Sequence, residues 1–179
     1  EPPQPAHRLP PIPMNTTSPD TGSRLPSLAF WLLLTLAAGG VGAIASASAP
    51  AFYLSLDRPA WAPPPWLFGP VWTLLYVLMG LSAWLVWRAR RLDAGATPYV
   101  LFFAQLAANA AWTWLFFAWR QGQWAFIEIL LLVALIVATM AVFARIRPLA
   151  AVLLAPYLAW VCFATALSFS VWQRNPGLL

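Results

Sequence analysis

The chain has 179 residues, of which 61% are hydrophobic and 8% are charged, and it contains 12 tryptophans. Water-soluble domains carry roughly 25% charged residues, so most of this surface faces a solvent other than water. The net charge of +5 comes from arginines at the ends of apolar segments, which indicates membrane topology rather than nucleic-acid binding. The single cysteine, Cys162, excludes a disulfide framework or a cysteine-based metal site within one chain.

The N-terminal stretch is rich in proline and contains almost nothing that could build a core. This composition predicts a disordered tail over residues 1–26. Met14 begins a more ordinary N-terminal sequence, which leaves open whether residues 1–13 belong to the native protein. Residues 27–175 are expected to form an all-α integral membrane domain, a bundle of five transmembrane helices.

Five apolar segments are long enough to cross a bilayer core of about 30 Å at 1.5 Å per residue. The predicted helices span about residues 28–49, 66–87, 99–118, 124–143 and 149–171. Pro50 is expected to end the first helix, and Pro156 predicts a kink in the fifth. Small residues recur at four-residue spacing in the first helix, for example Gly39 and Ala43. They allow close approach of another helix, from the same subunit or from a second one.

The first connection, residues 51–65, is the longest between the predicted helices, and long ordered loops are usually functional. Its second half, residues 58–65, is here called the strap. Pro63, Pro64 and Pro65 force the strap to run extended, so its aromatic neighbours are presented on a stiff segment. Two interpretations remain open: an aromatic belt at the membrane interface, or a cover over a pocket for a flat apolar molecule.

Polar side chains interrupt two of the predicted helices. Gln105 and Asn109 share one face of the third helix, and because an amide facing lipid is costly, both must point into the bundle. They either hold helices together or anchor a ligand in a pocket. Glu128 lies about one turn inside the fourth helix. It is expected to be an interfacial carboxylate near an arginine rather than a buried proton carrier.

The arginines are distributed unequally across the predicted membrane, with seven on the N-terminal side and three on the other. The larger group is Arg8, Arg24, Arg88, Arg90, Arg91, Arg145 and Arg147, and the smaller is Arg58, Arg120 and Arg174. The positive-inside rule therefore predicts a multi-pass protein with a cytoplasmic N-terminus and an external C-terminus.

Several motifs now stand in a specific order: Arg58–Pro64, Trp66–Gly80, Gln105–Trp112 and Pro156–Leu167. Together they resemble the TspO family of translocator proteins, also known as peripheral-type benzodiazepine receptors. The resemblance covers roughly residues 52–175 and implies a multi-pass protein of a bacterial cell membrane.

The resemblance also implies a five-helix bundle, often a homodimer, that binds protoporphyrin and other tetrapyrroles, sterols and synthetic benzodiazepine-site ligands. It implies a pocket that opens towards the connection between the first two helices. The residues themselves offer no Cys/His/carboxylate cluster for a metal, and no cofactor is expected. Carried over by position, the ligand-binding residues would be Tyr53, Phe68, Trp72, Tyr76, Asn109, Trp112, Trp160, Ala164 and Leu167. Some family members are reported to break down protoporphyrin in light, and Trp72 and Trp160 hold the implicated positions.

One departure concerns sterols. The family's sterol motif expects a tyrosine where this chain has Phe169, preceded by Ser168 in place of the usual asparagine. The Leu/Val–Tyr–Lys/Arg pattern is thus broken, which weakens the expectation of sterol binding.

The sequence bears on three classes of function. The first is a binding protein that transports tetrapyrroles, regulates their synthesis or disposes of them. The alternative is an ion-coupled secondary transporter, but such proteins usually carry ionisable groups near the midplane, and none is seen in the five segments. An acid–base enzyme would require a histidine or a tuned carboxylate, so any breakdown of porphyrin is expected to be photo-oxidative.

Overall fold

The computed structural model describes residues 24–89 and 95–179. The predicted tail therefore lies almost entirely outside the described residues, as do Arg90 and Arg91. The described part contains six α-helices and no strands, which confirms the all-α fold class. They are α1 (Arg24–Ala45), α2 (Ala49–Ser55), α3 (Phe68–Ala89), α4 (Thr97–Thr113), α5 (Gly122–Ile146) and α6 (Pro148–Arg174).

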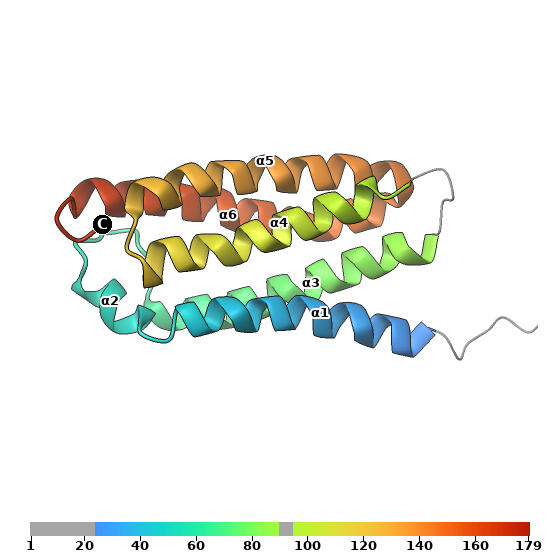
Figure 1. Cartoon of the computed structure of the whole chain (residues 1–179), viewed down its shortest axis with the longest axis horizontal. Helices are drawn as coiled ribbons and strands as arrows, with labels where there is room; N and C mark the ends of the chain where they lie inside the picture. Colours follow the sequence, from blue (N-terminus) through green and yellow to red (C-terminus); the bar gives the residue numbers. More distant parts are fainter. Residues whose placement is uncertain (1–23, 90–94) are drawn as a thin grey trace, which may run out of the picture.

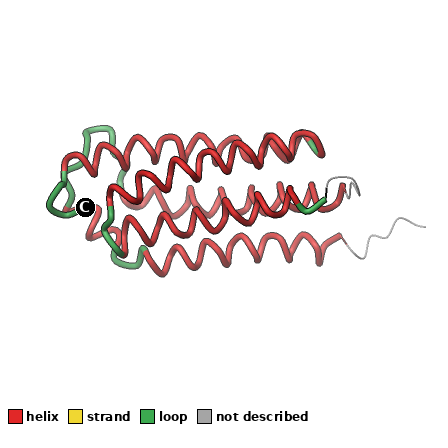
Figure 2. Tube along the Cα trace, turned by 45° about the horizontal axis from the view of Figure 1, so that its top comes forward, coloured by secondary structure: helices red, strands yellow, loops and turns green. Residues whose placement is uncertain are grey.

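All the helices except α2 belong to segments that are long and apolar enough to span a membrane, as predicted. Figures 1 and 2 show them side by side as an elongated bundle in which consecutive long helices run in opposite directions. The contacts between helices close a ring in the order α1, α3, α6, α5, α4 and back to α1. The core of the bundle lies inside this ring.

The ends of the helices differ from the expected positions. The first helix ends at Ala45, and Pro50 lies in the first turn of the separate short helix α2. A proline is tolerated there because the first backbone N–H groups of a helix have no intrahelical partner. About a third of the segment expected to be a loop is therefore helical. In α6 the helix continues through Pro156 without interruption.

The end of α4 has an irregular backbone that no sequence pattern predicts. A π-helical turn over Trp114–Ala118 follows α4, and a tight turn then leads into α5. Arg120 in this turn has φ of 54°, in the left-handed region that few non-glycine residues adopt. The turn places the Arg120 guanidinium 4.7 Å from the ring centroid of Phe52 in α2. It thereby connects α2 to the α4–α5 corner.

Candidate functional site

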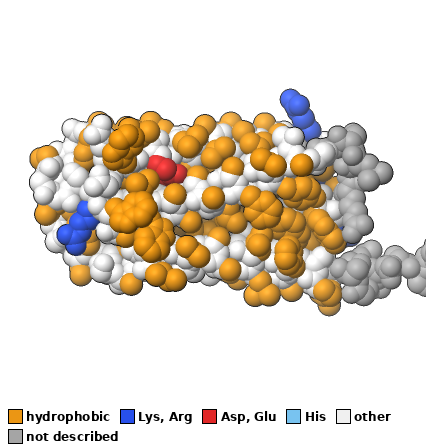
Figure 3. Space-filling view, in the orientation of Figure 1, with side chains coloured by type: hydrophobic (Ala, Val, Ile, Leu, Met, Phe, Trp, Pro, Cys, Tyr) orange, Lys and Arg blue, Asp and Glu red, His pale blue; other side chains and the backbone are white. Residues whose placement is uncertain are grey.

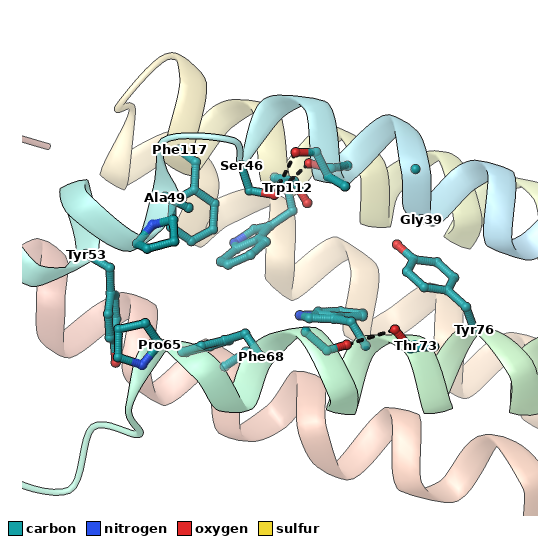
Figure 4. Close-up of a pocket in the computed structure, with 18 of the residues that line it drawn as sticks. Gly39, Ser46, Ala49, Tyr53, Pro65, Phe68, Thr73, Tyr76, Trp112 and Phe117 are labelled. Atoms are coloured by element: carbon teal, nitrogen blue, oxygen red, sulfur yellow. Dashed lines mark hydrogen bonds between the residues drawn. The ribbon is translucent and has the colours of Figure 1, made fainter.

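A cavity of about 570 Å³ lies at the α2 end of the bundle, between α1, α3, α4 and α6. One wall is aromatic and the other consists of small residues from α1. The aromatic wall contains Tyr53, Trp66, Phe68, Trp72, Tyr76, Trp112, Phe117 and Trp160. The small wall contains Gly39, Gly40, Gly42, Ala43 and Ser46. Figure 4 shows the cavity extending from Tyr53 at one end to Tyr76 at the other.

The aromatic rings pack mostly edge to face. Phe68 lies 5.4 Å from Tyr53 and 5.9 Å from Trp160 between ring centroids, with interplanar angles of 75° and 71°. Trp72 lies 5.8 Å from Tyr76 and 6.3 Å from Tyr157. Such ring pairs prefer this geometry, so each ring fixes the orientation of the next. The wall is therefore organised before any ligand arrives.

The small wall results from glycines that bring α1 close to the aromatic wall. A Cβ atom at Gly39 would lie 2.7 Å from the ring of Tyr76, closer than real Cβ contacts allow. At Gly42 a Cβ atom would meet the Thr113 hydroxyl oxygen at 3.4 Å. Gly39 is thus needed for Tyr76 to lie under α1. The sequence identified this spacing as a helix-packing signal but not as a pocket wall.

Behind the inner end of the cavity lies a chain of hydrogen bonds. The Tyr76 hydroxyl donates to Asn109 Oδ1 at 2.6 Å, and Asn109 Nδ2 donates to the Tyr157 hydroxyl at 3.1 Å. Asn109 is 2% exposed and does not line the cavity. The position of Asn109 therefore favours the first interpretation, in which its amide holds helices together, because it joins α3, α4 and α6. Of the three hydrogen-bonded residues, only Tyr76 lines the cavity.

Two indole groups that line the cavity have no partner. Nε1 of Trp112 and Nε1 of Trp160 are buried and make no hydrogen bond in the described structure. Buried donors in proteins are almost always paired, so the described structure lacks an acceptor beside each of these indoles. The cavity wall itself is mostly aromatic and aliphatic and therefore suits an apolar molecule.

The carboxylate of Glu128 is placed differently from the expectation. Both of its oxygens are buried and have no hydrogen-bond partner among the described residues, so the predicted pairing with an arginine is absent there. Its helix, α5, contributes no residue to the cavity wall.

The end of the cavity next to α2 is covered by α2 and the strap. The Tyr53 hydroxyl donates to the carbonyl of Pro63 at 3.0 Å, which joins the two parts of the cover. The Arg58 guanidinium lies 4.8 Å from the ring centroid of Tyr53. Burial raises the pKa of the Tyr53 phenol above its usual range, and Arg58 opposes part of this rise. The phenol thus stays protonated at neutral pH and keeps its bond to Pro63.

The positions predicted to bind a ligand are mostly brought together. Seven of the nine line the cavity: Tyr53, Phe68, Trp72, Tyr76, Trp112, Trp160 and Ala164. Asn109 and Leu167 are buried outside it. The α1 wall, together with Thr73, Thr113 and Phe117, was not predicted as part of a site. Contact of the nine predicted residues with a ligand remains a prediction.

Comparison with known proteins gives a consistent result. The family model described as TspO/MBR family matches residues 31–173. The chain is 42% identical to the translocator protein of Homo sapiens over 128 residues, which cover 70% of this chain and 76% of that protein. It is 39% identical to the tryptophan-rich protein TspO of Chlorobaculum tepidum over 155 residues, 84% of this chain and 96% of that protein.

A third relative is protein CrtK of Rhodobacter capsulatus, 37% identical over 150 residues that cover 83% of this chain and 92% of that protein. The region matched by the family model includes most or all of each of the five long helices and every wall of the cavity. On these grounds the chain belongs to the TspO/MBR family of integral membrane proteins.

Proposed function

We propose that the chain is a membrane binding protein for tetrapyrroles such as protoporphyrin IX. One observation carries the proposal: aromatic side chains from α2, α3, α4 and α6 converge on a single cavity. A porphyrin is a flat π-system, and aromatic rings provide large apolar faces for it at low cost in rotamer entropy. A volume of about 570 Å³ lies in the range of roughly 300–1,000 Å³ that is typical of small-molecule sites.

The polar groups around the cavity support the same class of ligand. The indole N–H groups of Trp112 and Trp160 lack acceptors, and a porphyrin carries carboxylate oxygens. Arg58 lies over Tyr53 at the covered end, where a guanidinium can pair with a carboxylate at the rim. The proposed ligand therefore supplies both the flat apolar body and the acceptors that the cavity lacks.

The proposal is tested by titrating the detergent-solubilised protein with protoporphyrin IX and following the quenching of tryptophan fluorescence. Trp72→Ala and Trp160→Ala should each weaken the affinity by about tenfold, because each removes a ring that would contact the porphyrin. Trp124→Ala is the matched control, since Trp124 is 59% exposed and lies outside the cavity. Unchanged affinity in both pocket variants would reject this site.

Light-dependent breakdown of the bound pigment is part of the proposal only as photochemistry. None of the described lining residues is a histidine, cysteine or carboxylate, so the cavity wall offers no ordinary acid–base group. Excited pigment and oxygen would react, with Trp72 or Trp160 as electron donor or quencher. Pigment absorbance should therefore fall in light and persist in darkness when protein is present. Rapid loss in darkness would contradict photochemistry.

A further inference from the structure

The cavity is open along one side of the bundle. Seven of its lining residues are exposed on the surface of the described structure: Leu36, Gly40 and Ala43 on α1, Gly69 and Thr73 on α3, and Pro50 and Trp66 at the covered end. In Figure 4 the cavity is viewed with α1 above and α3 below, and the labelled side chains between them are visible without an intervening helix. The two helices thus form the rims of a lateral opening.

The glycines on the two rims have nothing in front of them. A Cβ atom built on Gly40 or on Gly69 would meet no heavy atom within 4 Å. One residue earlier, a Cβ atom on Gly39 would collide with Tyr76. Gly39 is therefore required by packing, whereas Gly40 and Gly69 leave the space between the two rims free of side-chain atoms.

A second route into the cavity would lead through the cover, which is held in place by hydrogen bonds. Asn175 Oδ1 accepts from the backbone N–H of Asp57 at 2.9 Å, and its Nδ2 donates to the Asp57 carbonyl at 2.9 Å. Nδ2 also donates to the Val171 carbonyl of α6 at 2.7 Å, and Asn175 is 7% exposed. These bonds tie the junction between α2 and the strap to the end of α6. The Arg120 contact with Phe52 holds the cover at one further point, and the Tyr53 bond to Pro63 joins its two parts.

The rims belong to helices that span the membrane. Their outward neighbours are apolar and exposed, including Leu33, Val41 and Leu74 at 68%, 48% and 58%. Exposed side chains of this kind in a membrane span contact acyl chains. The lateral opening therefore faces the hydrocarbon region rather than water.

We propose that the pocket takes its ligand from the hydrocarbon region of the bilayer, through the opening between α1 and α3, while the cover stays closed. The ligand class is a flat apolar molecule that dissolves in the membrane and carries oxygen acceptors for the two free indole donors. This route rests on the proposed function, since it concerns how a ligand reaches that same pocket. It differs from the expectation that the pocket opens towards the first connection.

The first test measures rates of binding in lipid vesicles that already contain protoporphyrin IX. Gly40→Leu and Gly69→Leu should each slow both association and dissociation by about fivefold, because a narrowed gate lowers both rates whereas a damaged pocket speeds dissociation. Ala37→Leu, at an exposed position of α1 that does not line the cavity, is the control and should change neither rate. Asn175→Ala, which frees the cover, should not accelerate association. Faster association in Asn175→Ala with no effect of the two leucines would overturn the proposal.

The second test does not depend on porphyrin. The protein is reconstituted in vesicles of a phosphatidylcholine with a diazirine in the middle of its acyl chain, irradiated, and mapped by mass spectrometry. Adducts are expected on Trp72 or Tyr76 in the wild type and should fall about fivefold in a Gly40→Leu/Gly69→Leu double variant. Their absence, with Leu33 labelled normally, would refute the opening. If protoporphyrin IX does not bind at all, the proposed ligand is wrong, and this experiment still decides the route.

Discussion

Asn109 is the residue at which three helices of the bundle are joined. Its side-chain amide accepts from Tyr76 of α3 and donates to Tyr157 of α6, while its backbone belongs to α4. Tyr157 is completely buried and Tyr76 is 7% exposed, so water does not replace these bonds at low cost. The position of the Tyr76 ring in the cavity depends on this amide.

Replacing Asn109 with alanine should therefore destabilise the bundle by about 1–2 kcal/mol, since two phenols lose their partner and membrane hydrogen bonds are individually modest. Thr165→Ala is the control, because the Thr165 hydroxyl bonds only to the Val161 carbonyl of its own helix. Reversible unfolding in mixed detergent and SDS micelles gives both free energies. Equal losses in the two variants would show that the Asn109 bridge does not hold the helices together.

For single residues, the sequence predicted whether a side chain points into the bundle better than it predicted which residue it bonds to. An amide in an apolar helix must point inward, and Asn109 does. The partners, residues 76 and 157, are phenols far away in the chain, and no local pattern pairs them. Glu128 is a residue for which the predicted environment is wrong. Its place about one turn inside the helix predicts an arginine partner at the interface, but its side chain points so that both oxygens are buried. Directions that depend on tertiary packing cannot be read from spacing alone.

The cover over the cavity is attached to the end of α6 by both a charged and an uncharged side chain. The exposed ion pair between Arg174 and Asp57 spans 3.7 Å, with the two side chains 47% and 65% exposed. Pairs of this kind contribute little because water screens them. The buried Asn175 side chain, with its three bonds, is therefore expected to provide most of the attachment at this point.

Asn175→Ala should consequently increase amide hydrogen exchange by more than about tenfold over residues 56–63, because local opening no longer breaks those bonds. Amides in the centre of α5 should exchange as in the wild type. Arg174→Ala removes the neighbouring ion pair and should leave exchange in the strap nearly unchanged. The reverse order of effects would mean that the charge pair, not the amide, fastens the cover.

The long helices could be predicted from the sequence because length and apolar composition decide whether a segment spans a membrane. Their ends could not, because they depend on local backbone geometry. A proline such as Pro50 favours the end of a helix, but it also suits the first turn of a new one, α2. The left-handed backbone of Arg120 and the π-turn before it leave no compositional signal. These irregular pieces all lie at the cavity end, where they place the cover.

For the whole molecule, the family motifs predicted the aromatic wall of the pocket, and the glycine spacing predicted only that α1 packs closely. The wall that α1 provides emerges when the ring of helices closes and brings Gly39 against Tyr76. A lateral opening is a property of that assembled ring. The opening cannot be predicted from any one segment of the sequence, because its rims come from two helices separated by the first connection.

The charged ends of the bundle predict the direction in which the molecule crosses the membrane. The described arginine side chains lie at the two ends of the bundle: Arg88, Arg145 and Arg147 at one, and Arg58, Arg120 and Arg174 at the other. On the face shown in Figure 3, Lys and Arg atoms gather only at these ends. Including the arginines outside the described residues, the count is seven against three.

The positive-inside rule then predicts that the seven-arginine end is cytoplasmic and that the cover and the C-terminus are external. An alkaline phosphatase fused after Leu179 should be active and a fluorescent protein at the same place dark, because each reporter matures on one side only. Reporters inserted between α3 and α4 should give the opposite pair of signals and so control for expression. A fluorescent C-terminal fusion would reverse the orientation and place the cover of the pocket in the cytoplasm.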